Sequence, residues 1–222
     1  MNWMKKVAVA LVCLLPLGLQ AAKVDTLQVK SPSMNKSIEV VVVSPDMAAT
    51  EACPVIYLLH GYGGNARTWV GIKPDLPKIA DEKGIFFVCP DGKNTWYWDS
   101  PLNADVRYET FISDELVKYV DSHYKTVADR KGRAITGLSM GGHGAMWNGL
   151  RHSDVFSAAG STSGGVDIRP FPKNWEMSVQ IGEKAKYPEN WEKYTVINLV
   201  PTLRKDQIAL IFDCGDSDFF LE

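Results

Sequence analysis

The sequence predicts an α/β fold in which a mostly parallel, doubly wound sheet has helices on both faces. Two observations support this prediction. Short apolar runs recur along the chain and end in Gly, Pro, Asp or Ser, and segments with helical spacing lie between them. Apolar runs of this length are typical of parallel strands buried on both faces. Strands that alternate with helices in this way form a doubly wound sheet.

The expected strands follow one another along the whole chain. Residues 24–30 and 37–43 alternate or run apolar and stop at Ser44-Pro45, which predicts an antiparallel opening pair. Five buried strands are then expected at residues 55–59, 85–89, 134–136, 156–160 and 208–212.

Helices are expected between these strands. Residues 110–124 place apolar side chains at steps of three and four, which predicts one apolar stripe. Residues 142–151 are a second helical segment, and residues 68–82 a weaker one that two prolines interrupt. Residues 164–205 are less regular. They are either a cap over the functional site or a surface loop with packing tryptophans.

The N-terminal segment has the pattern of a secretory signal peptide. Lys5 and Lys6 precede an apolar run over residues 7–19, and Ala21 and Ala22 follow it. The apolar run is shorter than the roughly 20 residues that a membrane-spanning helix needs. The alternative to a signal peptide is an uncleaved N-terminal anchor.

The predicted organisation is therefore a signal peptide at residues 1–22 and one α/β domain at residues 23–222. Export also predicts a secreted or periplasmic protein with no stable membrane association after cleavage.

Composition narrows the class of protein. The 222 residues are 45% hydrophobic and 23% charged, with a formal net charge of −2. This balance gives no electrostatic reason to expect nucleic acid or an anionic membrane as a partner. Cys53, Cys89 and Cys214 have no metal-ligand spacing, and Cys89 and Cys214 lie at the ends of apolar runs, where buried free thiols are expected. We expect neither a metal nor a cofactor.

The most informative segment is residues 133–144, where an apolar strand end runs into Gly137-Leu138-Ser139-Met140-Gly141. This Gly-x-Ser-x-Gly pattern predicts a nucleophile elbow with the Ser139 hydroxyl at its apex. Glycines at 137 and 141 have no Cβ, so the chain can turn tightly there. The helix that follows directs its N-terminus at the same place, where an anion is favoured.

A glycine-rich loop at residues 60–64, His60-Gly61-Tyr62-Gly63-Gly64, follows the 55–59 strand. We expect the N–H groups of Tyr62 and Met140 to form an oxyanion hole, because Met140 directly follows the nucleophile.

These motifs together resemble the esterase D family of α/β-hydrolases, which includes tributyrin esterases, S-formylglutathione hydrolases, secreted feruloyl and acetyl-xylan esterases and the mycolyltransferases. The resemblance covers roughly residues 35–222. It is based on residues 57–64 and 137–144, Pro90-Asp91-Gly92, residues 96–100, Tyr108-Glu109 and residues 213–218. It implies an α/β-hydrolase fold and a Ser-Asp-His triad with Ser139 as nucleophile.

Three carboxylates follow the last expected strand and are candidates for the triad acid: Asp213, Asp216 and Asp218. The family pattern Cys-Gly-x-x-Asp implies Asp218. Asp213 at the strand end is the alternative, with a structural hydrogen-bonded carboxylate as its ordinary role.

The histidine of the triad should follow the acid in this fold. Only residues 219–222 follow Asp218, and none is histidine. We expect His60 to shape its loop, His143 to be badly oriented, and His123 and His152 to lie at the far end of the strands. The expectation is a C-terminally incomplete chain that lacks a strand and a helix and is itself poorly active.

Three adjacent aromatic residues, Trp96, Tyr97 and Trp98, follow the turn at residues 90–92. Trp96 and Trp98 are predicted to line a substrate pocket at the rim of the cleft, with loop packing as the alternative.

The favoured function is a secreted serine esterase that hydrolyses carboxylic esters through an acyl-enzyme on Ser139. The substrate would be a small-molecule or polysaccharide-linked ester. One alternative is an acyltransferase of the mycolyltransferase type, which would use the same residues with another acceptor. The other is a non-catalytic binding protein on a hydrolase scaffold, because the triad histidine is absent.

Overall fold

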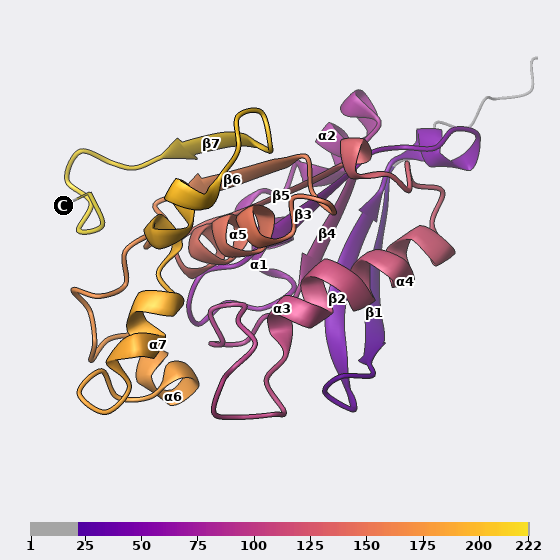
Figure 1. The fold of residues 1–222 in the computed structure, drawn as a ribbon. Helices are drawn as coiled ribbons and strands as arrows, with labels where there is room; N and C mark the ends of the chain where they lie inside the picture. Colours follow the sequence, from indigo (N-terminus) through magenta and orange to yellow (C-terminus); the bar gives the residue numbers. More distant parts are fainter. Residues whose placement is uncertain (1–21, 222) are drawn as a thin grey trace, which may run out of the picture.

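The computed structural model describes residues 22–221, so the predicted signal peptide at 1–22 lies outside it except for Ala22. Seven strands form one sheet in the order β1-β2-β4-β3-β5-β6-β7 (Figure 1). The strands are β1 (Lys23–Ser31), β2 (Lys36–Ser44), β3 (Val55–Leu59), β4 (Phe86–Pro90), β5 (Arg133–Gly137), β6 (Ala158–Thr162) and β7 (Ala209–Asp213). β1, β2 and β4 pair antiparallel, and every other neighbouring pair is parallel. This confirms the predicted fold class.

Helices fill the connections between the strands. They are α1 (Thr68–Ile72), α2 (Leu76–Lys83), α3 (Tyr108–Thr110), α4 (Leu116–His123), α5 (Met140–Arg151), α6 (Met177–Ile181) and α7 (Pro188–Lys193). The 3-10 helices are η1 (Asp46–Ala49), η3 (Arg130–Gly132) and η4 (Val196–Thr202), and a π-helical stretch, η2 (Phe111–Glu115), joins α3 to α4.

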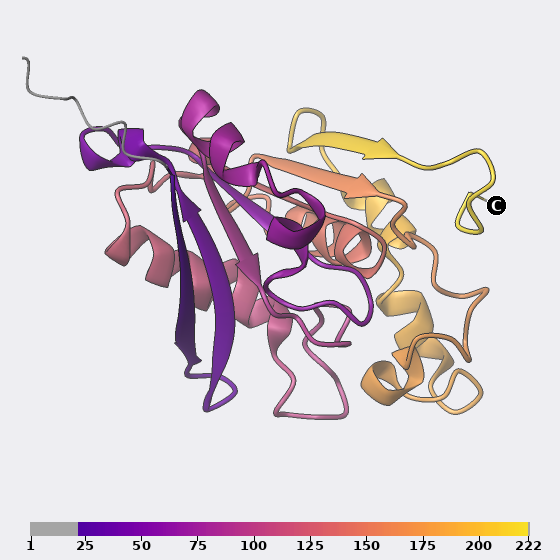
Figure 2. The ribbon, with the colours of Figure 1, turned by 180° about the vertical axis from the view of Figure 1, so that it is seen from behind.

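The two faces of the sheet have separate hydrophobic cores. α1 and α2 cover one face, where Val41, Leu58 and Ala80 belong to a compact cluster (Figure 2). α3, α4 and α5 cover the other face, where the larger cluster contains most of the buried aromatic residues. Helices on both faces are what a sheet with apolar strands requires, since both sides must be removed from water.

β6 starts two residues later than the apolar run at 156–160 predicts. The Phe156 N–H bonds to the carbonyl of His152 in a turn, and the Phe156 ring packs edge-on against Tyr57 with centroids 5.7 Å apart. An apolar side chain that packs from a turn has the same sequence pattern as one on a strand, so the run alone does not locate the strand end.

β7 differs from the other parallel strands because all five of its residues are exposed. It pairs with β6 on one side, and no other strand within residues 22–221 lies on its second side. Ile211 and Phe212 are each 75% exposed.

The irregular segment at residues 164–205, called the excursion below, holds α6, α7 and η4. Trp191 is fully buried in it and donates its indole N–H to the Gly182 carbonyl at 2.9 Å. α6 and α7 extend from the same end of the molecule as the β1–β2 turn (Figure 1). No helix within residues 22–221 is long and apolar enough to cross a membrane.

Candidate active site

Ser139 lies at the turn from β5 into α5. Its φ of +53° and ψ of −119° are strained for a residue with a Cβ, and its side chain is partly exposed. The Ser139 N–H donates to the Thr162 carbonyl at the end of β6 at 2.9 Å. The Ser139 carbonyl accepts the His143 N–H at 3.0 Å. The backbone is thereby held from both sides in the geometry of a nucleophile elbow.

The two glycines beside Ser139 permit this turn for a steric reason. A Cβ at Gly137 would lie 2.4 Å from the backbone of Gly141, and a Cβ at Gly141 would lie 2.1 Å from the Leu59 carbonyl oxygen. No larger residue fits either position without moving the backbone of β3 or α5.

The oxyanion loop, residues 60–64, lies directly against the elbow. A Cβ built on Gly61 would be 3.5 Å from the Cβ of Ser139. Within residues 22–221, the N–H groups of Tyr62 and Met140 have no hydrogen-bond acceptor. Two free donors beside a strained serine are suited to an oxyanion that forms on a carbonyl attacked by Ser139.

His60 fixes the oxyanion loop through hydrogen bonds of both its ring nitrogens. It is 1% exposed, and its Nε2 accepts the Gly92 N–H at 2.9 Å. Its Nδ1 therefore has the proton and donates to the Gly61 carbonyl at 2.7 Å. With both ring nitrogens occupied, His60 shapes the loop as expected.

The sequence predicts that Trp96 and Trp98 line the rim of a cleft, but the structure buries both of them. They are 1% and 0% exposed, and their rings stack with centroids 5.6 Å apart. The Trp98 indole donates to His143 at 2.9 Å. Their apolar rings are removed from water inside the larger core, so the loop-packing alternative describes them.

Tyr97, the middle residue of the aromatic triplet, packs against the loop at residues 60–64. Its hydroxyl donates to the His60 carbonyl at 2.9 Å. A Cβ on Gly92 would lie 2.1 Å from the Tyr97 ring, and one on Gly144 would lie 2.3 Å from it. Because Gly144 lies 46 residues after Trp98 in the sequence, no local pattern indicates this packing.

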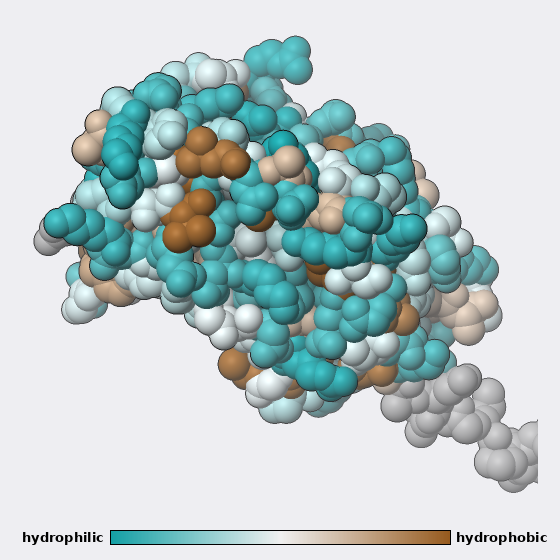
Figure 3. Space-filling model, turned by 90° about the horizontal axis from the view of Figure 1, so that it is seen from below, coloured by the Kyte–Doolittle hydropathy of each residue, from teal (hydrophilic) through white to brown (hydrophobic). Residues whose placement is uncertain are grey.

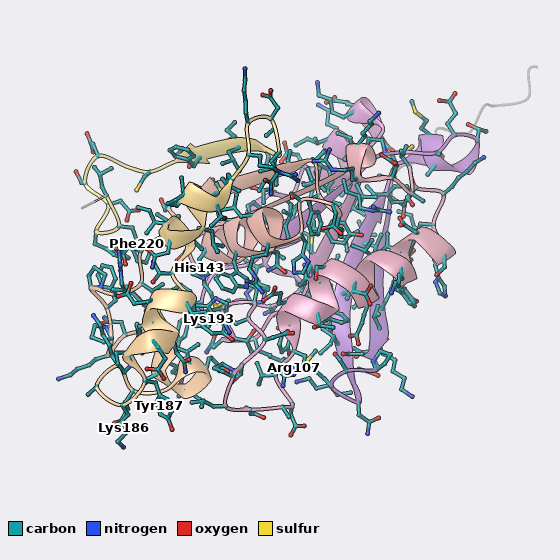
Figure 4. The ribbon with its side chains drawn as sticks, viewed as in Figure 1. Arg107, His143, Lys186, Tyr187, Lys193 and Phe220 are labelled. Carbon is teal, nitrogen blue, oxygen red and sulfur yellow. The ribbon has the colours of Figure 1, made fainter. Side chains whose placement is uncertain are left out.

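His143 has no role toward the Ser139 hydroxyl. It is fully buried, accepts from Trp98, and donates from Nδ1 to the Gly165 carbonyl at 2.7 Å (Figure 4). Burial lowers the pKa of His143 to about 4. The imidazole is therefore neutral near pH 7 and has no free nitrogen with which to accept a proton from serine.

The other two histidines bond elsewhere. His123 Nδ1 contacts the Tyr119 carbonyl at 2.8 Å at the end of α4. His152 Nε2 lies 2.8 Å from Glu109 Oε1. No histidine nitrogen of the described chain forms a hydrogen bond with the Ser139 side chain.

Asp218 lies on the loop after β7, at the same end of the sheet. Its Oδ1 accepts the Phe220 N–H at 2.8 Å. This bond and the nearby Ser163 hydroxyl lower the pKa of Asp218. Ser163 follows Thr162, which accepts the Ser139 N–H, so a short path of contacts joins Asp218 to the elbow. No histidine in the described range bonds to the Asp218 carboxylate.

Backbone strain is concentrated around this site. Nine non-glycine residues of the described chain have positive φ. Seven of them are on the elbow or on loops that meet near it, namely Lys93, Trp96, Tyr97, Ser139, Ser163, Trp175 and Glu176. Such strain persists only where the surrounding structure enforces it, and it gathers at functional sites.

Figure 3 shows the molecule from below, toward the ends of β1 and β4, and this face is mainly hydrophilic with small separate hydrophobic patches. A large apolar cavity lies elsewhere, against β7. Its volume is about 600 Å³, and residues of α5, η4, β7 and the C-terminal segment line it, including Met146, Val196, Leu210 and Phe220.

Comparison with known proteins decides the family. The family model described as "Putative esterase" matches residues 31–222. The chain belongs to this esterase family. Membership supports an ester hydrolase or an acyltransferase as the class of protein, in agreement with the elbow and the free N–H donors.

Relatives in the esterase family include an esterase of Mycobacterium tuberculosis, 30% identical over 149 residues, which are 64% of this chain and 32% of that protein. An acetyl esterase of Caldicellulosiruptor saccharolyticus is 31% identical over 108 residues, which are 48% of this chain and 40% of that protein. The chain therefore matches less than half the length of these two relatives.

Solved structures of esterases share the fold. An S-formylglutathione hydrolase from Agrobacterium tumefaciens has a TM-score of 0.75 at 23% identity, over 91% of this chain and 78% of that one. A ferulic acid esterase has a TM-score of 0.72 at 29% identity, over 91% and 82% of the two chains.

Proposed function

We propose that this protein is a serine esterase that cleaves carboxylic esters through an acyl-enzyme on Ser139. The observation that carries the proposal is the strained Ser139 at the β5–α5 turn, beside the N–H groups of Tyr62 and Met140, which have no acceptor in the part of the chain that the structure describes. The substrate class is a small-molecule or polysaccharide-linked ester, which agrees with the acetyl and ferulic acid esterases among the relatives.

In the proposed reaction, Ser139 Oγ attacks the ester carbonyl and loses its proton to a base. The two N–H groups stabilise the oxyanion, and its collapse releases the alcohol. Water then attacks the acyl group and regenerates the serine. Asp218 is the proposed acid of the triad, which would orient a histidine base.

A fluorophosphonate probe tests this proposal, because it phosphonylates an activated serine. Labelling should occur on Ser139 and disappear in the Ser139→Ala variant. Ser122→Ala is the matched control, since Ser122 is an exposed serine of α4 whose hydroxyl bonds to the Tyr119 carbonyl of the same helix, and its loss should leave labelling at Ser139 in place. Labelling that survives in Ser139→Ala would contradict the proposal.

We further infer that the 222-residue chain turns over esters slowly. His60 and His143 have both ring nitrogens occupied, and His123 and His152 bond elsewhere. Unassisted serine is a poor nucleophile near neutral pH. A base supplied in solution should therefore raise the rate.

Imidazole is such a base. At 100 mM and pH 7.5 it should increase acylation of the wild-type chain by p-nitrophenyl acetate by about tenfold over the background seen with Ser139→Ala. An equal imidazole effect in both chains would show that no serine-specific rescue occurs. Product analysis with added alcohols separates hydrolysis from acyl transfer, since a transferase forms new ester in preference to free acid.

Export is a separate part of the proposal and depends on the pattern of residues 1–22. Expression in a bacterial host with N-terminal sequencing of the periplasmic protein should give a mature chain that starts near residue 23. Recovery of the uncleaved chain in the cytosol would contradict export.

A further inference from the structure

The oxyanion loop contains a tight turn whose form is defined by its hydrogen bonds. The Gly64 N–H donates to the Gly61 carbonyl at 3.0 Å, which closes a four-residue turn with Tyr62 and Gly63 at its centre. Gly63 has a φ of +77°, the pattern of a type II turn. The central peptide of such a turn can flip, and a flip would change the backbone angles on both sides of it.

One side chain binds this central peptide. The Gly63 N–H donates to Asn94 Oδ1 at 2.9 Å. This bond selects the orientation of the peptide that joins Tyr62 to Gly63. Since the Tyr62 N–H is on the adjacent peptide, Asn94 helps to determine where that oxyanion donor points.

Asn94 is in turn connected to the excursion. Its Nδ2 donates to Glu176 Oε2 at 3.3 Å. The nearby Glu176 carboxylate also helps to raise the pKa of the Tyr62 hydroxyl, after the main effect of burial. Glu176 is thus connected to the oxyanion loop through the two hydrogen bonds of Asn94.

The backbone of Glu176 is held in place for these contacts. Trp175 and Glu176 have φ values of +48° and +54° in succession, just before α6. The Trp175 carbonyl accepts the indole N–H of the buried Trp96 at 3.1 Å. A strained pair fixed by a core tryptophan is unlike the conformation of a loop that is free to move.

We propose that Asn94 and Glu176 are positioning residues that hold the oxyanion loop in its productive form and so couple the excursion to the catalytic centre. This inference rests on the proposed function of Ser139. Glu176 is exposed and Asn94 is half-buried, so their bonds contribute little to global stability. Their effect is on the direction of an oxyanion donor, which acts in the transition state.

The test measures the rate of Ser139 labelling by a fluorophosphonate as a function of probe concentration, with the 222-residue chain in imidazole buffer. In Asn94→Ala the maximal rate should fall about tenfold while the half-saturating concentration stays within about twofold, since the donor of a transition-state bond is misplaced. The melting temperature should match that of the wild type.

Exchanging the donor and the acceptor between residues 94 and 176 distinguishes a positioning role of their hydrogen bond from a mere packing role. Asn94→Asp keeps the acceptor for the Gly63 N–H but places a carboxylate against Glu176, and it should label slowly. Adding Glu176→Gln restores a donor opposite that carboxylate, so the double variant should regain most of the wild-type rate. Lys186→Gln, at the outer tip of the excursion (Figure 4), is the matched control and should label at the wild-type rate.

The outcomes are distinguishable. If wild type and Ser139→Ala label equally, the proposed function fails. If Ser139 is labelled specifically but Asn94→Ala reacts at the wild-type rate, or if the double variant is as slow as Asn94→Asp, the positioning inference alone is overturned.

Discussion

At the scale of single residues, the site depends on backbone positions that admit no Cβ. Gly141 shows this most clearly, because a Cβ there would overlap the Leu59 carbonyl of the neighbouring strand β3. Gly71 in α1 is the opposite case, because a Cβ there would meet nothing within 4 Å. Packing against β3 therefore requires a glycine at position 141, whereas position 71 has room for a side chain.

Gly141→Ala is therefore expected to lower the free energy of unfolding by at least about 2 kcal/mol, because β3 and α5 must separate to admit the methyl group. Gly71→Ala should instead raise it by about 0.5–1 kcal/mol, since alanine has the better helix propensity. Urea unfolding of the two variants measures both values. Equal changes would mean that contact with Leu59 is not the cause.

At the scale of elements, the buried carboxylate of Glu109 in α3 links that helix to α5. Glu109 is 6% exposed, and its two oxygens accept from Trp147 Nε1 and Arg151 Nε at 2.7 Å each. His152 Nε2 lies 2.8 Å from the same carboxylate. Burial raises the pKa of Glu109, but the bonds from His152 and Arg151 outweigh it, and the net shift is downward. The carboxylate is thus ionised at neutral pH and fixes α5, which begins at the elbow.

Glu109→Gln should reduce the free energy of unfolding by about 2 kcal/mol, because an amide cannot accept from all three donors and leaves one of them unpaired. Glu82→Gln is the matched control. Glu82 has a 55% exposed side chain that pairs only with Lys78, so its loss should cost less than about 0.5 kcal/mol. Guanidinium unfolding at pH 7 compares the two. A Glu109→Gln value as small as the control would show that the cluster does not hold α5.

At the scale of the whole molecule, stability should depend on pH through His143. The folded-state pKa of about 4 lies below the ordinary value of 6.5, since burial disfavours the charged ring. The unfolded chain therefore binds a proton at a higher pH than the folded chain does. Stability is greatest above the unfolded pKa and falls as the pH drops from about 6.5 toward 4.

Between pH 7 and pH 5 this one group should remove about 2 kcal/mol from the free energy of unfolding. Urea unfolding at the two pH values measures the loss in the wild type and in His143→Gln. The variant is less stable at pH 7 but should lose about 2 kcal/mol less over the same interval. An identical loss in both proteins would assign the pH dependence to other groups.

Much of this protein follows from local sequence. The predicted runs match six of the seven strands to within one residue at each end, because an apolar or alternating run bounded by turn residues is recognisable without knowledge of its neighbours. The Gly-x-Ser-x-Gly pattern locates the elbow because the turn, packed against β3, leaves no room for a Cβ at residues 137 and 141. The loop at residues 60–64 is recognisable for a related reason, since Gly63 needs a positive φ.

Contacts between distant segments could be decided only by the tertiary structure. The adjacent aromatic residues at 96–98 suggest a binding surface in sequence, yet Trp96 and Trp98 are buried because α5 and the excursion close over them. Asn94 and Glu176 are 82 residues apart and have no local pattern that pairs them. Their role beside the oxyanion loop depends on how the excursion packs against the sheet, and the sequence around either residue does not specify that packing.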